Sequence, residues 1–125
     1  PTERLYAYFC YFRLDVDKMR EATSYFIGTH DFASFCSQKT QASTTIRTIY
    51  SLEILQDEDM LTMVIRGDGF LYNMIRIIAG TLIKVGIGVY PPEHVKKIFA
   101  SKNRLSAGQT MPARGLTLVE IEYLE

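Results

Sequence analysis

The stretch FLYNMIRIIAGTLIKVG, residues 70–86, is almost wholly apolar and carries one arginine, Arg76, near its middle. Its large apolar residues recur at spacings of three and four, which predicts a helix that buries a broad face in a core. These residues are Leu71, Met74, Ile75, Ile78, Leu82 and Val85. Asn73, Arg76, Gly80 and Lys84 fall near one narrow polar line of the same helix. The fold must therefore place a permanent positive charge beside its core.

The same stretch has about the length of a membrane span. Asn73, Arg76 and Lys84 interrupt it, and an arginine or lysine at the centre of a span costs about 3 kcal/mol on insertion scales. The sequence contains no second candidate span. The pattern favours a buried helix of a globular domain, with no membrane partner.

Arg76 has no acidic neighbour on its own helix. The residues three and four positions away are Tyr72, Asn73, Ala79 and Gly80. Two interpretations are open. Arg76 reaches solvent or a carboxylate that the fold brings to it, or it is positioned for a carboxylate or phosphate outside this domain. The residues by themselves favour the first interpretation.

The composition is that of one ordinary globular domain. The chain has 125 residues, of which 47% are hydrophobic and 22% charged, enough for one core and too few for two. Fourteen basic residues balance fourteen acidic ones, which argues against a strong polyanion binder of the histone type. A locally basic face for nucleic acid remains open. The sequence begins directly on structured-looking residues and reads as a piece of a longer protein.

The cysteines and histidines predict neither a disulfide nor a metal site. Cys10 and Cys36 have no CxxC spacing and no signal peptide precedes them, so we expect reduced thiols in a cytoplasmic protein. Together with His30 and His94 they lack the paired spacing of zinc ligands.

The order of predicted elements indicates an α+β fold. We expect an extended segment at 4–12, a helix over 14–28 with Asp15 as its N-cap and Gly28 at its end, and a loop with or without a short helix over 29–45. A β-hairpin over 45–56 and 60–69, the helix at 70–86, a helix that begins near Pro91 and Pro92, and a strand at 115–125 follow. This order predicts an antiparallel sheet with helices on one face, of the ferredoxin-like or RNA-recognition-motif (RRM) type. Its first strand is either 4–12 or lies upstream.

Three motifs carry a family resemblance. GTHDFASF (28–35), GDGFLYNMIRIIAGTLIKVG (67–86) and MPARGLTLVEIEY (111–123) resemble the C-terminal half of TruA-family tRNA pseudouridine synthases. The match covers nearly the whole chain, in order. It implies that residues 1–125 are the C-terminal domain of an isomerase in which two halves share a sheet and tRNA lies in the cleft between them.

The resemblance also implies an activity. Members of this family convert uridine to pseudouridine in the tRNA anticodon stem-loop, at positions 38 to 40, as homodimers and without cofactor or metal. The catalytic aspartate belongs to the N-terminal half, so we expect residues 1–125 to be inactive by themselves.

The resemblance assigns roles to individual residues. Arg76 matches the arginine that forms an ion pair with the catalytic aspartate. With this match, the interpretation that Arg76 is positioned for a carboxylate outside this domain becomes the preferred one. Leu116 matches an apolar residue facing the uracil pocket, although the strand pattern fits an ordinary core leucine equally well. Asp31, Phe32, Ser34 and Phe35 match a segment that shapes the cleft or the RNA-binding face, with core packing of the two rings as the alternative.

Three basic residues are candidate phosphate contacts, namely Lys39, Arg47 and Arg114. Each is otherwise a solvated surface charge. Tyr6, in RLYAY, lies too close to the first helix to match the base-stacking tyrosine of the family, so we expect it to pack on the domain surface.

Two other functions are compatible with the predicted fold. A stand-alone RNA-binding module would stack bases on aromatic residues of its central strands, and the predicted hairpin lacks such a row. A protein-interaction domain would use an exposed face of the sheet.

Overall fold

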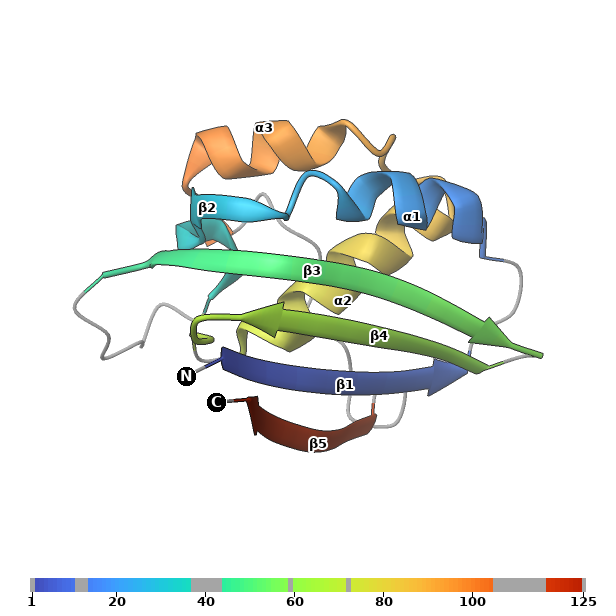
Figure 1. The fold of residues 1–125 in the computed structure, drawn as a ribbon. Coiled ribbons are helices and arrows are strands. Elements are labelled where there is room, and N and C mark those ends of the chain that lie inside the picture. Colours follow the sequence, from blue (N-terminus) through green and yellow to red (C-terminus); the bar gives the residue numbers. More distant parts are fainter. Residues whose placement is uncertain are drawn as a thin grey trace.

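Five antiparallel strands form one sheet in the order β2-β3-β4-β1-β5 (Figure 1). The structure is a computed structural model that describes residues 2–10, 14–36, 44–58, 60–71, 73–104 and 117–124. The strands are β1 (Thr2–Cys10), β2 (Gly28–Asp31), β3 (Ile46–Asp57), β4 (Met60–Gly67) and β5 (Thr117–Leu124). Without β2, the order β3-β4-β1-β5 is that of the ferredoxin-like sheet. The predicted fold class is confirmed, and β1 settles which segment is the first strand.

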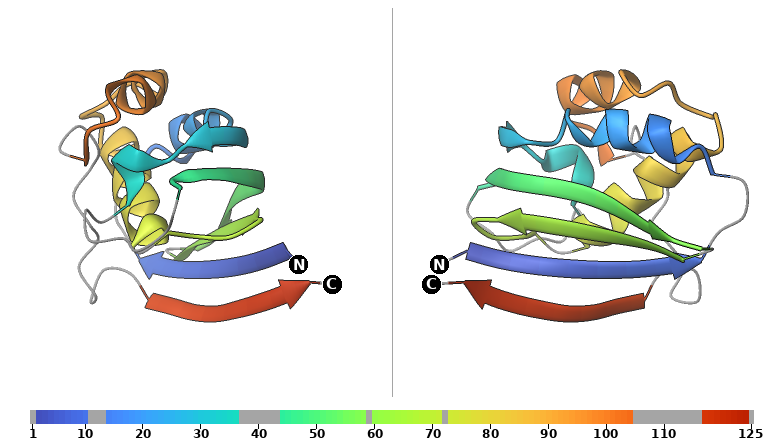
Figure 2. Two further views of the ribbon diagram at one scale, coloured as in Figure 1. Left: turned by 90° about the vertical axis from the view of Figure 1, so that its left-hand side faces the viewer. Right: turned by 45° about the vertical axis from the view of Figure 1, so that its right-hand side comes forward.

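The described helices lie on one face of the sheet. They are α1 (Val16–Thr23), α2 (Met74–Gly86) and α3 (His94–Ser101), with a short 3₁₀ turn η1 (Ala33–Phe35) between β2 and β3. Figure 2 shows α2 crossing this face, with α1 and α3 further from β1 and β5. No described helix lies on the opposite face, which we call the open face.

The helix α2 forms the centre of the core, as its sequence predicts. All six large apolar residues named for it are buried, and Ile77 is buried with them. The backbone N–H of Asp15 donates to the carbonyl of Gly86 at 2.9 Å, which joins the start of α1 to the end of α2. The Asp15 carboxylate accepts from the N–H of Lys18 at 3.1 Å and so is the predicted N-cap. Within the described residues, no helix has both the length and the apolar character needed to cross a membrane.

Two predictions about the segment 14–45 were wrong. The first helix ends at Thr23 and not at Gly28. The side chains of Thr23 and Ser24 donate to the carbonyls of Arg20 and Glu21, and such local bonds compete with continuation of the helix.

The second correction concerns the predicted loop. Its first residues form β2, which pairs with β3 from Gly28–Ile49 to Asp31–Ile46. Four residues are too few to show the alternation by which a strand is recognised in a sequence. We attribute the strand to its pairing with β3.

Candidate functional site

Arg76 lies in the first turn of α2, half-buried, with no acidic residue in that turn. A helix N-terminus carries a partial positive charge, so a cation there is unfavourable unless an anion lies close by. Asn73, at the N-cap position, has a left-handed backbone (φ 61°) and makes no capping bond with its side chain. Among the described residues, none makes a hydrogen bond or ion pair with Arg76. Within the part of the chain that the structure describes, no anionic partner therefore offsets the positive charge at this end of α2.

The connection from β4 to α2 is fixed to β3 by two hydrogen bonds. The N–H of Asp68 donates to the carbonyl of Thr48 at 3.1 Å, and the N–H of Thr48 donates to the Asp68 carboxylate at 3.0 Å. Gly67 makes this close approach possible, because a Cβ there would lie 2.8 Å from the Thr48 carbonyl oxygen. These contacts explain Gly67 and Asp68 of the GDG sequence and fix where the α2 segment leaves the sheet.

Arg47 lies beside the same connection. A Cβ on Gly69 would lie 3.8 Å from its Nε. Its Nη1 donates to the carbonyls of Thr44 at 2.9 Å and Ile46 at 2.7 Å, which holds the side chain in one conformation. Arg47 is thus an ordered cation near the segment that leads to Arg76.

The aromatic residues of the DFASF segment lie inside the domain. Phe32 and Phe35 are fully buried, and their ring centroids lie 5.1 and 4.8 Å from that of Phe99 on α3. The hydroxyl of Ser34 is also buried and donates to the carbonyl of Ile98 at 2.8 Å. These three side chains are therefore packed in the interior of the domain, and none of them has exposed surface that RNA could contact.

Asp31 organises the loop around it. Its Oδ1 accepts from the N–H of Ala33 at 3.1 Å and from the Thr45 hydroxyl, and its Oδ2 lies 4.0 Å from Nζ of Lys102. Asp31 therefore joins β2, the start of β3 and the end of α3.

Two basic residues at this end of the domain were not predicted as site residues. Lys102 pairs with Asp31, and Arg104 follows it in the chain. Burial raises the pKa of the Cys36 thiol, as does the charge of Asp31, while Arg104 and Arg47 act in the opposite direction. Arg47 and Arg104 therefore both lie close enough to act on the pKa of the same thiol. The signal in the sequence was the pair of basic residues in KNR, directly after a predicted helix.

Several predicted residues lie outside the described part of the chain, namely Lys39, Arg114 and Leu116, together with the side chain of Cys10. In the part that is described, no three His, Cys, Asp or Glu residues are grouped so that they could hold a metal ion.

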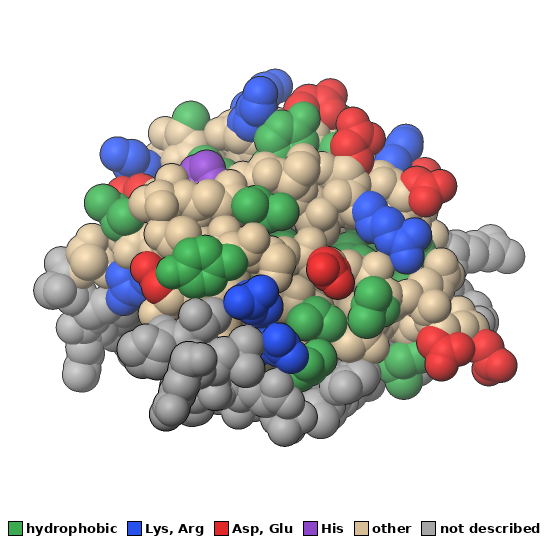
Figure 3. Space-filling model, viewed as in Figure 1, with side chains coloured by type: hydrophobic (Ala, Val, Ile, Leu, Met, Phe, Trp, Pro, Cys, Tyr) green, Lys and Arg blue, Asp and Glu red, His purple; other side chains and the backbone are tan. Residues whose placement is uncertain are grey.

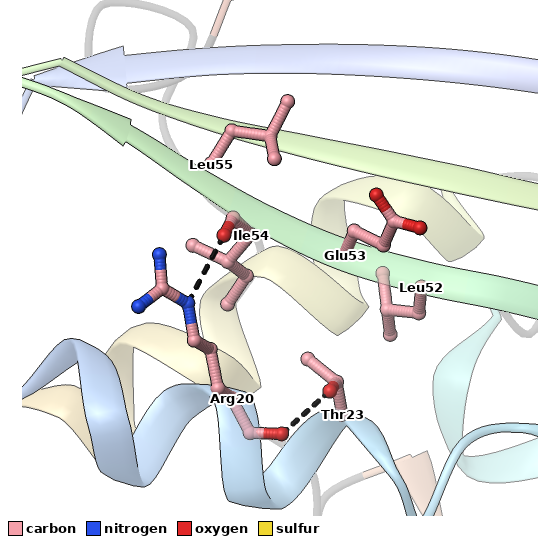
Figure 4. A pocket seen from close by; sticks show the side chains of 6 residues that line it. All are labelled: Arg20, Thr23, Leu52, Glu53, Ile54 and Leu55. Atoms are coloured by element: carbon pink, nitrogen blue, oxygen red, sulfur yellow. Dashed lines mark hydrogen bonds between the residues drawn. The ribbon is translucent and has the colours of Figure 1, made fainter.

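An open cavity of about 380 Å³ lies between α1 and β3 (Figure 4). Arg20 crosses it and donates from Nε to the carbonyl of Ile54 at 3.2 Å. In Figure 4 the side chains of Leu52 and Ile54 point from β3 toward α1, and that of Glu53 points to the other side of the strand. None of the residues that line the cavity was predicted as a site residue.

Comparison with known proteins identifies the family. Residues 22–124 match the family model described as tRNA pseudouridine synthase. The chain is 53% identical over 118 residues to tRNA pseudouridine synthase A of Bacillus pumilus, covering 93% of this chain and 48% of that protein. It is 50% identical over 121 residues to the protein of the same name from Bacillus subtilis (97% and 49%) and 46% identical over 120 residues to that of Clostridium kluyveri (96% and 49%).

The chain thus spans about half the length of the curated relatives it matches. The family match covers more than half of the chain, including the segments that carry Asp31, Arg47 and Arg76. The chain therefore belongs to the tRNA pseudouridine synthase family, among its TruA members.

Proposed function

We propose that this chain is the C-terminal part of an enzyme that isomerises uridine to pseudouridine at positions 38 to 40 of the tRNA anticodon stem-loop. The observation that supports the proposal most directly is Arg76, a half-buried cation in the first turn of α2 without a described anionic partner. The names of the relatives, tRNA pseudouridine synthase A, agree with this activity.

The chemistry explains why such an arginine is needed. Isomerisation breaks the bond from the ribose carbon to the uracil nitrogen and forms a bond from the same ribose carbon to a uracil carbon. A carboxylate that acts as nucleophile or base in this process must stay ionised in a site partly shielded from water. A neighbouring guanidinium lowers the pKa of such a carboxyl group. We propose that Arg76 provides this charge to an aspartate in the other half of the protein. The reaction is an isomerisation without net oxidation or group addition, so we propose no cofactor.

The tRNA phosphates are proposed to bind at the end of the domain where Asp31 joins β2 and α3. Arg47 on β3, and Lys102 and Arg104 in the segment directly after α3, lie around it, and phosphate contacts come mainly from such side chains. Lys39 and Arg114 are proposed to add to this surface, and Leu116 to face the uracil. We further propose that the intact enzyme is a cytoplasmic homodimer.

The proposal is tested by substitution of Arg76 in the intact protein, with tritium release from uridine-labelled tRNA as the readout. Arg76→Ala should lower kcat by about a hundredfold or more, which corresponds to roughly 3 kcal/mol of transition-state stabilisation. Arg76→Lys should recover part of the loss, because lysine keeps the charge but lacks the bidentate guanidinium.

Lys84→Ala is the matched control, because Lys84 is a half-buried cation on the same polar line in the last turn of α2. It should leave kcat within about threefold of the unmodified enzyme, since Lys84 lies at the opposite end of α2 from Arg76, away from the proposed chemistry. Full turnover by folded Arg76→Ala would exclude the proposed role of this arginine.

A further inference from the structure

The outer edge of β3 has no strand partner over its second half, within the part of the chain that the structure describes. β2 pairs only with residues 46–49, and β3 runs on to Asp57. An uncovered strand edge presents N–H and C=O groups that pair readily with another extended chain. This half of β3 is therefore a place where a further strand can be added.

The carbonyl of Ile54 shows which backbone groups point out from this edge. It accepts a hydrogen bond of 3.2 Å from Nε of Arg20, and Figure 4 shows this bond leaving β3 toward α1. In an antiparallel sheet the backbone groups of every second residue point to the same side of a strand. Leu52 and Gln56 therefore present their N–H and C=O groups at the same edge. Among the described residues, none makes a backbone hydrogen bond to these groups from that side.

A groove lies beside this edge. The open cavity of about 380 Å³ between α1 and β3 is lined by Arg20 and Thr23 from α1 and by residues 52–55 of β3. Leu52 and Ile54 point toward α1 and give the cavity an apolar wall (Figure 4). We call this cavity and the adjoining edge of β3 the edge groove. An extended chain along the edge would place every second side chain in it.

Arg20 covers the edge groove with a contact that is easily exchanged. Its side chain is 48% exposed, and its Nη1 lies 4.0 Å from Oδ1 of Asp17, which is itself 96% exposed. Exposed ion pairs of this kind add little to stability. A backbone N–H of a bound chain can replace Nε of Arg20 as the donor to Ile54, and the released guanidinium stays close to Asp17. Opening the edge groove therefore breaks one hydrogen bond, which the bound chain restores.

The charges around the edge groove are mainly negative. The exposed acids are Asp17 and Glu21 on α1, Glu53 and Asp57 on β3, and Glu58 directly after it, whereas the exposed bases are Lys18 and Arg20. In Figure 3, acidic side chains are spread over the right-hand end of the molecule, where Figure 1 places α1 and the end of β3. Such a surface attracts a positively charged partner and repels the phosphates of RNA.

We infer that the edge groove binds an extended, positively charged peptide segment of another protein, which pairs with Leu52, Ile54 and Gln56 as an added strand. Strand addition of this kind draws its affinity from main-chain hydrogen bonds and its specificity from alternate side chains. The described strand pairs of this sheet are all antiparallel, so the added strand is antiparallel as well.

The alternation of side chains along β3 specifies what the peptide carries. Residues directly opposite each other in an antiparallel pair have their side chains on the same face of the sheet. Peptide residues opposite Leu52 and Ile54 enter the edge groove, so apolar side chains fit there. Peptide residues opposite Glu53 and Asp57 lie next to a carboxylate, so lysine or arginine fits there. The expected segment therefore alternates apolar and basic residues.

The test uses a short synthetic peptide of alternating valine and lysine residues, with blocked ends and a fluorescent label. Its binding to the intact protein is measured by fluorescence anisotropy. N-methylation of the valines removes the N–H groups that face β3 and should weaken binding by about tenfold or more. N-methylation of the lysines alters N–H groups that point away from β3 and should change the affinity by less than about threefold. Both modified peptides have the same charge, so electrostatic attraction alone does not distinguish them.

Substitutions in the protein test the two sides of the edge groove. Glu53→Lys should weaken binding by about tenfold, because it places like charges on neighbouring strands. Arg20→Ala should tighten binding by about threefold, since no side chain then competes for the Ile54 carbonyl. Glu93→Lys is the control, because Glu93 is an exposed acid at the N-cap of α3 and lies on neither α1 nor β3, and it should leave the affinity unchanged. Circular dichroism checks that each variant is folded.

Four outcomes would overturn the inference. They are no binding of the unmodified peptide, equal weakening by the two N-methylations, displacement of the peptide by tRNA, and tighter binding of a peptide of alternating valine and glutamate. Dissociation of a protein dimer as the peptide binds would likewise assign the edge groove to a second copy and not to a peptide. The peptide site shares no residue with the site proposed around Arg76, so tritium release from tRNA tests the isomerase activity independently of it.

Discussion

The hydroxyl of Ser34 donates a hydrogen bond of 2.8 Å to the backbone carbonyl of Ile98, and this buried bond joins η1 to α3 across 64 residues of sequence. Ser34→Ala removes the donor. The carbonyl keeps a second donor, the hydroxyl of Ser101 at 2.7 Å, so the loss in unfolding free energy should be about 1 kcal/mol. Urea denaturation of the two proteins measures the difference.

Combining Ser34→Ala with Ser101→Ala tests the same bond more sharply. The double variant leaves the Ile98 carbonyl without either hydroxyl donor, so its loss of unfolding free energy should exceed the sum of the two single losses. Ser24→Ala is the control, because the Ser24 hydroxyl makes a similar bond to Glu21 at an exposed position. Equal effects of Ser34→Ala and Ser24→Ala would mean that burial of the bond has no consequence for stability.

Gly86 ends α2 against α1 with no room for a side chain. A Cβ there would lie 2.7 Å from Sδ of Met19 and 2.9 Å from Cδ2 of Leu14. Gly86→Ala should therefore lower the unfolding free energy by about 1–3 kcal/mol, the usual cost of overpacking, although alanine is the better helix former. Thermal unfolding followed by circular dichroism measures this loss.

A second substitution identifies the clash as the cause. Met19→Ala creates space next to Gly86 at its own cost in buried area. In the double variant, the alanine at position 86 should cost less than it does alone, which gives a coupling energy of opposite sign to the single losses. If the two losses of unfolding free energy simply add, the contact with Met19 is not what excludes a side chain at position 86.

Long, regular patterns in this sequence were sufficient to predict their elements. The apolar spacing of α2 predicted its buried face, and the alternation in β3 and β4 predicted the hairpin. Asp15 was recognised as the cap of α1 because its bond to Lys18 is local. The strand β2 and the end of α1 were not predicted, because both depend on partners: β2 on its pairing with β3, and the helix end on side-chain bonds to its last turn.

For the candidate site, too, local features could be predicted from the sequence and long-range contacts could not. The sequence could show that Arg76 has no acid on its own helix, because that is a matter of spacing. It could not show that Phe32 and Phe35 are buried against Phe99, or that Lys102 comes to lie beside Asp31. Those contacts join segments more than sixty residues apart, and the fold alone brings them together.

Cys36 should be a free thiol that reacts slowly in the folded protein. Its side chain is buried, and burial followed by the charge of Asp31 raises the pKa of the thiol above the ordinary value. The thiol of the unfolded chain then loses its proton at lower pH than that of the folded chain. At neutral pH the thiol is protonated in both states, and its ionisation does not change the unfolding free energy. As the pH rises through the ordinary thiol pKa, ionisation in the unfolded chain lowers the unfolding free energy. Timed iodoacetamide labelling with mass spectrometry at pH 7.5 and pH 9 measures the reactivity.

Denaturation before labelling provides the control. Without reductant, the unfolded protein should take up one group at Cys36 and one at Cys10. A mass lower by two protons and no labelling would instead indicate a disulfide. Labelling of Cys36 in the folded protein as fast as in the unfolded chain would contradict its burial.

Residues 1–125 expressed by themselves should bind no substrate productively and release no tritium from uridine-labelled tRNA. The physical reason is that the chemistry requires a carboxylate next to Arg76, and among the described residues none pairs with this arginine. The intact protein, assayed in parallel at the same concentration, should turn over. The circular dichroism spectrum and cooperative thermal unfolding of the fragment check that it is folded, so that an absence of tritium release cannot be ascribed to misfolding. Turnover by the folded fragment would show that its own residues supply the carboxylate, and Arg76 would then need a partner within this chain.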